Sequence, residues 1–222
     1  MSTITTKADE IQLIHPIPQD RYDDIISHLR SNFFLEEPLN KAVGLSSPNF
    51  DLEETILETL QENLSVMALK SDTEQVVGAA LNGISVPGDI VKAQEKLRKS
   101  NDEKFKKIFS FLYKTNGTAD LFNRFNVDRI FEGRILSVDA SLRGYGIGKR
   151  LTVQSEEIAR REKCRVWKMD VTGLYSQRIA ASYGFETIHE LEYETEVVEN
   201  GKPLFDIPSP HKCFKIVVKF LD

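Results

Sequence analysis

The chain has 222 residues, of which 41% are hydrophobic and 28% charged, a composition typical of a globular protein with a sizeable core. We therefore expect residues 1–222 to form a single domain. The net charge of −5 argues against a general attraction to nucleic acid or to anionic membranes.

The absence of targeting signals and the cysteine content bear on the compartment. No stretch of about 18 consecutive apolar residues occurs, so no membrane span is predicted. The polar residues 1–10 contain no apolar run, so no signal peptide is predicted. The only cysteines, Cys164 and Cys213, exclude a dense disulfide framework. We expect two reduced thiols in a cytoplasmic, monomeric protein without nucleic-acid or membrane partners.

The spacing of apolar residues predicts alternating strands and helices. In chain order we expect a strand at 11–17, a helix at 22–33, a loop at 33–50, a helix at 51–64, hairpin strands at 65–70 and 75–86, three helices within 88–126, a strand at 129–138, a helix at 146–162, a strand at 164–171, a helix at 174–185, and strands at 185–194 and 211–221. Asp51, with Glu54 three residues later, is the predicted N-cap of the helix at 51–64. The expected fold is mixed α/β, with a helical insertion between the third and fourth strands.

The stretch 141–151, SLRGYGIGKRL, places three glycines at alternate positions between a predicted strand and a predicted helix. Exposed N–H groups and the positive end of the helix dipole make such a helix N-terminus a site for anions. Gly144, Gly146 and Gly148 would let the main chain curl around a phosphate, and a basic residue lies on either side. A sharp turn alone would need only one or two glycines, so the pattern favours a phosphate cradle.

Two common phosphate motifs fit this stretch poorly. A P-loop requires Ser or Thr after its lysine, and here Arg150 follows Lys149. A dinucleotide-binding motif requires Gly-x-Gly-x-x-Gly directly after a strand, with an acidic residue about 20 positions on. Asp170 mimics that acid, but the glycine spacing differs and too few residues follow Asp170 for the rest of such a sheet.

The segment LSVDASLRGYGIGKRL resembles the acetyl-CoA-binding motif of the GCN5-related N-acetyltransferases, Arg/Gln-x-x-Gly-x-Gly/Ala. The resemblance implies a central, twisted, mostly antiparallel sheet of about seven strands flanked by helices. It also implies that the loop amides hold the pyrophosphate of acetyl-CoA, and that the preceding strand pairs with the pantetheine arm. The cofactor-binding residues implied in this way are Leu136, Ser137, Val138, Arg143, Gly144, Tyr145, Gly146, Ile147, Gly148, Lys149 and Ser176.

Two further segments resemble the insect arylalkylamine N-acetyltransferases, the dopamine N-acetyltransferase group. They are FFLEEPLN at 33–40 and TGLYSQRIAASYGF at 172–185. The resemblance implies that Glu37 is the catalytic base, acting through ordered water, and that Ser176 is one of two catalytic serines. The other serine is replaced by Thr172, which keeps a hydroxyl. The bland alternatives are a solvated loop acid for Glu37, a helix N-cap for Ser176 and a backbone contact for Thr172.

The chemistry and the resemblance together predict direct transfer of acetyl from acetyl-CoA to a primary amine in a ternary complex. The amine must lose a proton to a base before it attacks the thioester, and donors must meet the oxyanion that forms. A small arylalkylamine such as dopamine, serotonin or tryptamine is the expected acceptor. Alternatives are a polyamine, a peptide or lysine amine, or a coenzyme A-binding module without turnover. The histidines show no metal-ligand spacing, and no metal is expected.

Overall fold

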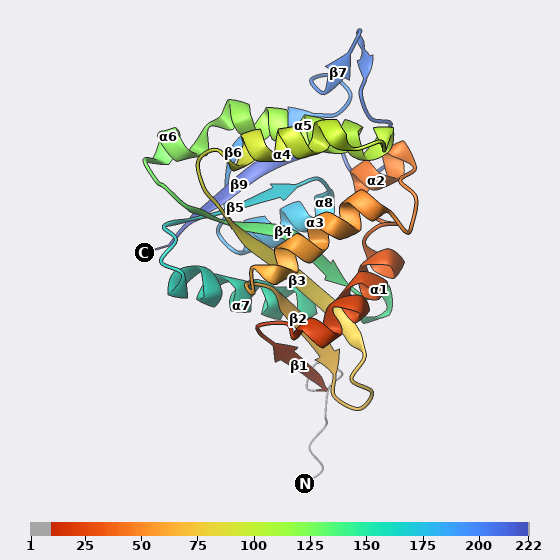
Figure 1. Cartoon of the computed structure of the whole chain (residues 1–222), viewed down its shortest axis with the longest axis vertical. Coiled ribbons are helices and arrows are strands. Elements are labelled where there is room, and N and C mark those ends of the chain that lie inside the picture. The colour runs from red at the N-terminus through yellow and green to blue at the C-terminus, as the bar shows by residue number, and fades with distance from the viewer. Residues whose placement is uncertain (1–9, 222) are drawn as a thin grey trace.

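The computed structural model describes residues 10–221. Seven strands form one sheet in the order β1-β2-β3-β4-β5-β9-β6 (Figure 1). Its strands are β1 (Ile11–Ile14), β2 (Val66–Lys70), β3 (Val76–Ser85), β4 (Ile130–Val138), β5 (Val166–Val171), β6 (Glu186–Glu192) and β9 (Cys213–Phe220). Among these neighbours only β4 and β5 run parallel, and the other pairs are antiparallel. The expected mostly antiparallel sheet of seven strands is confirmed.

Helices cover both faces of the sheet. One face is covered by the helices that precede β4, and the other by α7 and α8. The helices are α1 (Tyr22–Asn32), α2 (Pro38–Val43), α3 (Phe50–Gln61), α4 (Asp89–Lys99), α5 (Glu103–Ala119), α6 (Leu121–Phe125), α7 (Ile147–Arg161) and α8 (Leu174–Ser182), with short 3-10 turns at Gln19–Arg21 and Ala140–Leu142. Because α4, α5 and α6 lie between β3 and β4, the expected helical insertion is confirmed.

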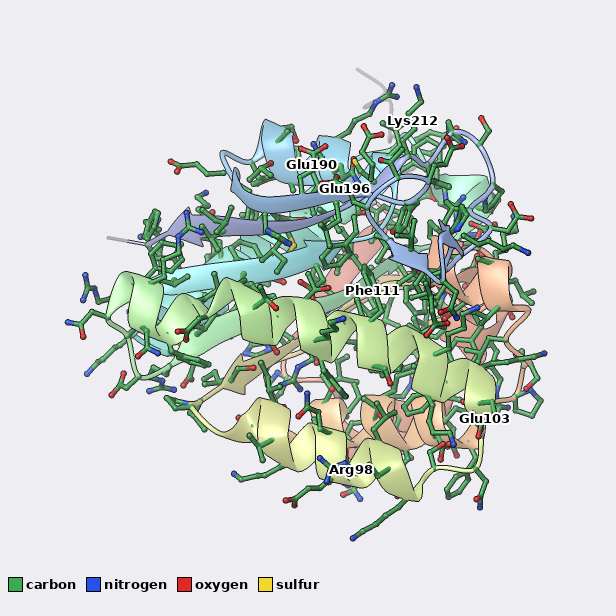
Figure 2. The ribbon with its side chains drawn as sticks, turned by 90° about the horizontal axis from the view of Figure 1, so that it is seen from above. Arg98, Glu103, Phe111, Glu190, Glu196 and Lys212 are labelled. Atoms are coloured by element: carbon green, nitrogen blue, oxygen red, sulfur yellow. The ribbon has the colours of Figure 1, made fainter. Side chains whose placement is uncertain are left out.

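Aromatic side chains fix the sheet between these layers. Trp167 on β5 is fully buried on the α7 face, where its ring lies 6.0 Å from Phe131 and 4.8 Å from Phe185. On the other face, Phe111 of α5 packs against Phe205 and Phe214, at centroid distances of 5.4 and 5.2 Å. Figure 2 shows α5 covering the sheet with α4 beside it, and Phe111 on the side of α5 that faces the sheet. These contacts hold α5 over the strands that carry the candidate site.

Two local expectations were wrong. The segment 33–50 is not all loop, because Pro38–Val43 forms α2. The N-cap of α3 is Asn49 rather than Asp51, since the Asn49 side chain accepts a hydrogen bond from the Leu52 amide. Between β6 and β9, where no element was predicted, a small hairpin of β7 (Val198–Glu199) and β8 (Lys202–Pro203) projects from one end of the molecule (Figure 1).

Two properties agree with the composition. Both cysteines are buried and free. Among residues 10–221, no helix is long and apolar enough to cross a membrane.

Candidate active site

The sheet opens between β4 and β5. The two strands pair only from Phe131 to Gly133 on β4 and from Trp167 to Met169 on β5. Beyond these pairs β4 continues to Val138, hydrogen-bonded to β3 alone, while β5 continues to Val171, hydrogen-bonded to β9. A register shift next to Arg134 bulges β4 where the strands part, and a bulge increases local twist. The result is a wedge-shaped opening whose β4 edge has backbone groups available to an amide-bearing ligand.

The glycine loop lies at the mouth of this opening. Gly144 and Gly146 have φ values of +85° and +78°, in the left-handed region that favours glycine. A Cβ added to either would meet no protein atom within 4 Å. Gly148 differs, because its φ is not positive and an added Cβ would only touch Val138 at 3.6 Å and Ile179 at 3.8 Å. Torsion therefore explains two of the glycines, whereas neither torsion nor crowding within the protein explains Gly148.

Helix α7 starts directly after this loop with unsatisfied amides. Its N-cap is Gly146, which offers no side-chain cap, and its first residue is Ile147. The first N–H groups of the helix therefore point outward, at the positive end of the helix dipole. The structure thus brings together the expected phosphate cradle, the end of β4 and the start of α7.

Three contacts, from successive positions along α1 and the residues after it, connect this part of the chain to the end of β4 and to the glycine loop. The ring Nε2 of His28 lies 3.0 Å from the Ser137 hydroxyl, in the interior. One turn later, the Asn32 side-chain oxygen accepts a hydrogen bond of 3.2 Å from the Ala140 amide. Eight residues after His28, Glu36 forms an ion pair with Arg143, the first residue of the glycine motif. Because Glu37 directly follows Glu36, these contacts connect the glycine loop to the candidate base.

Glu37 is the N-cap of α2 and is held by one of its carboxylate oxygens. Oε2 accepts a hydrogen bond of 2.6 Å from the Asn40 amide, while Oε1 is buried and has no hydrogen-bond partner. Burial raises the pKa of Glu37, although the Asn40 amide and the Thr172 side chain favour its charged form. The carboxylate is therefore a stronger base than a solvated glutamate, and one of its oxygens is free to accept a proton.

Thr172 meets Glu37 where β5 ends and α8 begins. The buried Tyr193 hydroxyl donates a hydrogen bond of 2.8 Å to the Thr172 carbonyl. A Cβ added at Gly173 would come within 3.0 Å of Pro38 and 2.9 Å of the His211 ring, so glycine allows the close approach of α2 to this turn. The His211 Nδ1 accepts a hydrogen bond of 3.0 Å from the Leu174 amide. These contacts place the predicted residues at 37 and 172 side by side.

Ser176 lies in the first turn of α8. It is not the N-cap, as one alternative suggested, because that position is Gly173. Its hydroxyl donates a hydrogen bond of 2.9 Å to the Gly173 carbonyl. Further along α8, Ala180 is buried, and after the helix the Tyr183 hydroxyl donates a hydrogen bond of 3.1 Å to the Lys149 carbonyl.

Several polar residues at this site were not predicted as functional. Tyr193 and His211 contact the turn at 172–174 from a late part of the chain. Lys168 and Asp170 lie on β5 beside the opening. Both are charged residues within an apolar strand, which is the one sequence signal that could have marked them. Among residues 10–221, no cluster of three or more His, Cys, Asp or Glu side chains could hold a metal ion.

A sheet that separates between two parallel central strands, beside a glycine-led helix, defines the fold of the GCN5-related N-acetyltransferases. No protein-family model matches the chain, whereas solved structures match over nearly its whole length. The arylalkylamine N-acetyltransferase 2 of Aedes aegypti is 45% identical, with a TM-score of 0.89 over 96% of this chain and 99% of that one. The chain therefore belongs to the arylalkylamine N-acetyltransferases, and it is an acyltransferase.

More distant structures share the fold. A mosquito arylalkylamine N-acetyltransferase-like 5b is 24% identical, with a TM-score of 0.87 over 95% of this chain and 100% of that one. The polyamine N-acetyltransferase of Drosophila melanogaster is 23% identical, with a TM-score of 0.86 over the same shares. At these identities the likeness concerns the fold alone. The predicted fold is confirmed by all three structures, and the predicted family and enzyme class are confirmed by the 45% identical one, while the roles of the individual site residues remain predictions.

Proposed function

We propose that this protein transfers the acetyl group of acetyl-CoA directly to the primary amine of a small arylalkylamine, such as dopamine, serotonin or tryptamine. The observation that carries the proposal is Glu37, a buried carboxylate with a raised pKa and one unpartnered oxygen, next to the end of β5 where the sheet opens. Family membership supports acetyl-CoA and an amine as the two substrates. In this proposal residues 1–222 act as one acetyltransferase domain.

The residues present fit acetyl-CoA. The β4 edge at Leu136, Ser137 and Val138 is not paired with β5, so its backbone could bond the amides of the pantetheine arm. The Ser137 hydroxyl is engaged by His28, so this residue offers its main chain rather than its side chain. Beyond this edge, the amides from Gly144 to Gly148, with Arg143 and Lys149, suit a pyrophosphate. Bound in this way, the thioester would lie in the opening between β4 and β5.

The proton chemistry falls to the residues around Glu37. In the proposal, Glu37 removes a proton from the acceptor ammonium through a water molecule, since an amine attacks only in its neutral form. The Thr172 hydroxyl orients that water or the carboxylate. Ser176 faces the departing thiolate and would have to release the Gly173 carbonyl before it donates its hydrogen bond. The proposal involves no covalent acetyl-enzyme, because both cysteines are buried and burial raises the pKa of each thiol, so neither is a ready thiolate nucleophile.

A panel of acceptors tests the proposal. Purified protein and acetyl-CoA are incubated with tryptamine, serotonin, dopamine, putrescine, agmatine and a lysine peptide, and thiol release is followed together with the mass of the product. We expect kcat/KM to be highest for the arylalkylamines. A preference for a diamine or for the peptide would contradict the assigned acceptor class. Binding of acetyl-CoA without transfer to any amine would instead indicate a module that has lost turnover.

A further inference from the structure

Asp170 lies where the sheet opens, and its role is not accounted for by the chemistry above. It is the first residue of β5 after the last pair with β4, which ends at Met169. Residues alternate faces along a strand, and the side chain of Asp170 points to the face covered by α5, where it meets Asn116. Figure 2 shows that helix covering the strands. Thr172, two residues further on, faces the same side. Asp170 is therefore at the apex of the opening, on the side from which Glu37 acts.

The hydrogen bonding of Asp170 repeats that of Glu37. Its Oδ2 accepts from Asn116 at 2.7 Å and from Lys168 at 2.9 Å, whereas its Oδ1 is buried without a partner. Each of the two carboxylates is thus fixed through one oxygen while the other is free. Both also raise the pKa of Tyr193, after the larger effect of burial, so both lie close to that side chain. A buried acceptor that lacks a donor is destabilising, so a ligand that supplies the missing donor would be favoured at this oxygen.

A role only as the counter-ion of Lys168 would leave this free oxygen unexplained. Lys168 is also bonded to Glu132 at 3.1 Å, and Glu132 in turn contacts Arg134. Arg134 also pairs with Glu62, so the three carboxylates of Glu62, Glu132 and Asp170 share two cations and the cluster keeps an excess of negative charge. The Lys168 side chain is only 7% exposed, but Asp170 retains 21% exposure. The side chain of Asp170 is therefore partly open while its unpartnered Oδ1 lies on the buried side, and its surroundings suit a positively charged group.

We infer that the free oxygen of Asp170 binds the acceptor's protonated primary amine and holds its nitrogen against the acetyl carbon at the apex of the opening. The inference rests on the proposed function and adds a second substrate-contacting carboxylate to it. The nitrogen gives one proton to Glu37 through water and forms the N–C bond. The C–S bond then breaks, the nitrogen loses a second proton and the thiolate takes one up. Ammonium and thioester thus become amide, thiol and one released proton, and Asp170 itself has no net change in protonation.

The test compares an amine with its uncharged analogue in Asp170→Asn and in a matched control, Glu132→Gln. Tryptamine is the substrate, and the corresponding alcohol, tryptophol, is the competitive inhibitor. For Asp170→Asn we expect the KM for tryptamine to rise at least tenfold, while the inhibition constant of tryptophol and the Kd of acetyl-CoA change less than threefold. Glu132→Gln disturbs the same Lys168 cluster without removing the free oxygen, so it should lower thermal stability yet leave the ratio of amine to alcohol affinity unchanged.

Loss of folding would not obscure the result. If Asp170→Asn leaves Lys168 without enough compensation, the double variant Lys168→Met with Asp170→Asn removes both charges together, and it should show the same loss of amine preference. An unchanged ratio of amine to alcohol affinity in a folded Asp170 variant overturns the inference and leaves the proposed function intact. A wild-type protein that acetylates no primary amine overturns both.

Discussion

The role of Glu37 as the base makes the strongest prediction for the reaction. Glu37→Gln keeps the size of the side chain and an oxygen for the Asn40 amide, but it cannot take a proton. Positioned general bases contribute about 10²- to 10⁴-fold to rate, which corresponds to about 3–5 kcal/mol of transition-state stabilisation. We expect kcat/KM for the amine to fall within that range at neutral pH, with the Kd of acetyl-CoA unchanged.

The pH profile separates the base from the acceptor's own ionisation. Burial raises the pKa of Glu37, so the acid limb of kcat/KM in the wild type should lie at a higher pH than for a solvated glutamate. Acceptors of different amine pKa should shift the limb that belongs to the amine but not the limb that belongs to Glu37. The limb that belongs to Glu37 is called the fixed limb, because its position does not depend on the acceptor. In Glu37→Gln this fixed limb should disappear.

A neighbouring residue provides the control. Glu36 is also acidic, but it is exposed and pairs with Arg143, so Glu36→Gln should retain the fixed limb. The measurement is thiol release at fixed times between about pH 5.5 and about 9. This range covers the titration of a carboxyl whose pKa is raised and the start of deprotonation of an amine. Wild-type kcat/KM in Glu37→Gln, or a fixed limb that persists in it, would refute the assignment of the base.

Three further outcomes follow from the geometry. Gly146→Ala forces a side chain into a φ of +78°, so it should lower both the melting temperature and the affinity for acetyl-CoA, whereas Gly148→Ala should lower the affinity alone. Scanning and titration calorimetry of both variants measure the two quantities. Equal losses of melting temperature in the two variants would contradict the prediction. Tyr193→Phe removes the hydrogen bond to the Thr172 carbonyl, so it should reduce the free energy of unfolding by about 1 kcal/mol, as measured by urea denaturation. In steady-state kinetics it should lower kcat by a larger factor than it lowers the affinity for acetyl-CoA. The folded chain holds the Glu37 proton more tightly than the unfolded chain does, so the free energy of unfolding should fall as pH rises from the ordinary carboxyl pKa of 4.5 through the raised pKa. In urea denaturation at several pH values, Glu37→Gln should remove this dependence of stability on pH. An unchanged dependence would contradict the raised pKa.

Most of the fold could be predicted because its elements are long enough for periodicity to be visible. Strands such as β3 and β9 run for ten and eight residues, and the faces of the longer helices show a clear apolar stripe. Helix α2 was missed because six residues make fewer than two turns, and the pattern needs more. Its ends do carry signals, with Pro38 at the first position and Gly44 in the left-handed conformation after the last, but both residues are equally common in loops.

The site was only partly predictable, for a different reason. The glycine loop and the segments around Glu37 and Thr172 are contiguous motifs, so a resemblance could identify them. Lys168 and Asp170 belong to no such motif, and an alternating charged pattern usually marks a solvent-exposed strand face. They are enclosed because α5 lies over them, and Lys168 finds its partner Glu132 thirty-six residues away in the chain. Local sequence does not contain that packing.

The three half-buried carboxylates, Glu37, Glu132 and Asp170, differ in how many of their oxygens the protein engages. Glu132 has both oxygens engaged, one by Lys168 and the other by Arg134. Although burial alone would raise it, these cations lower the pKa of Glu132 to about 2. Glu37 and Asp170 each have one oxygen engaged, and burial raises the pKa of both.

A carboxylate held through one oxygen keeps a fixed orientation while its second oxygen remains available, which is the preorganisation that proton transfer and ammonium binding require. A chain selected for stability alone would engage that second oxygen, because leaving it bare costs about 1–3 kcal/mol at each site. The two residues that carry these oxygens lie near the opening, Asp170 directly after the last β4–β5 pair and Glu37 beside the turn that follows β5. Their cost in stability is therefore concentrated where the substrates would meet, as expected if it is retained for function.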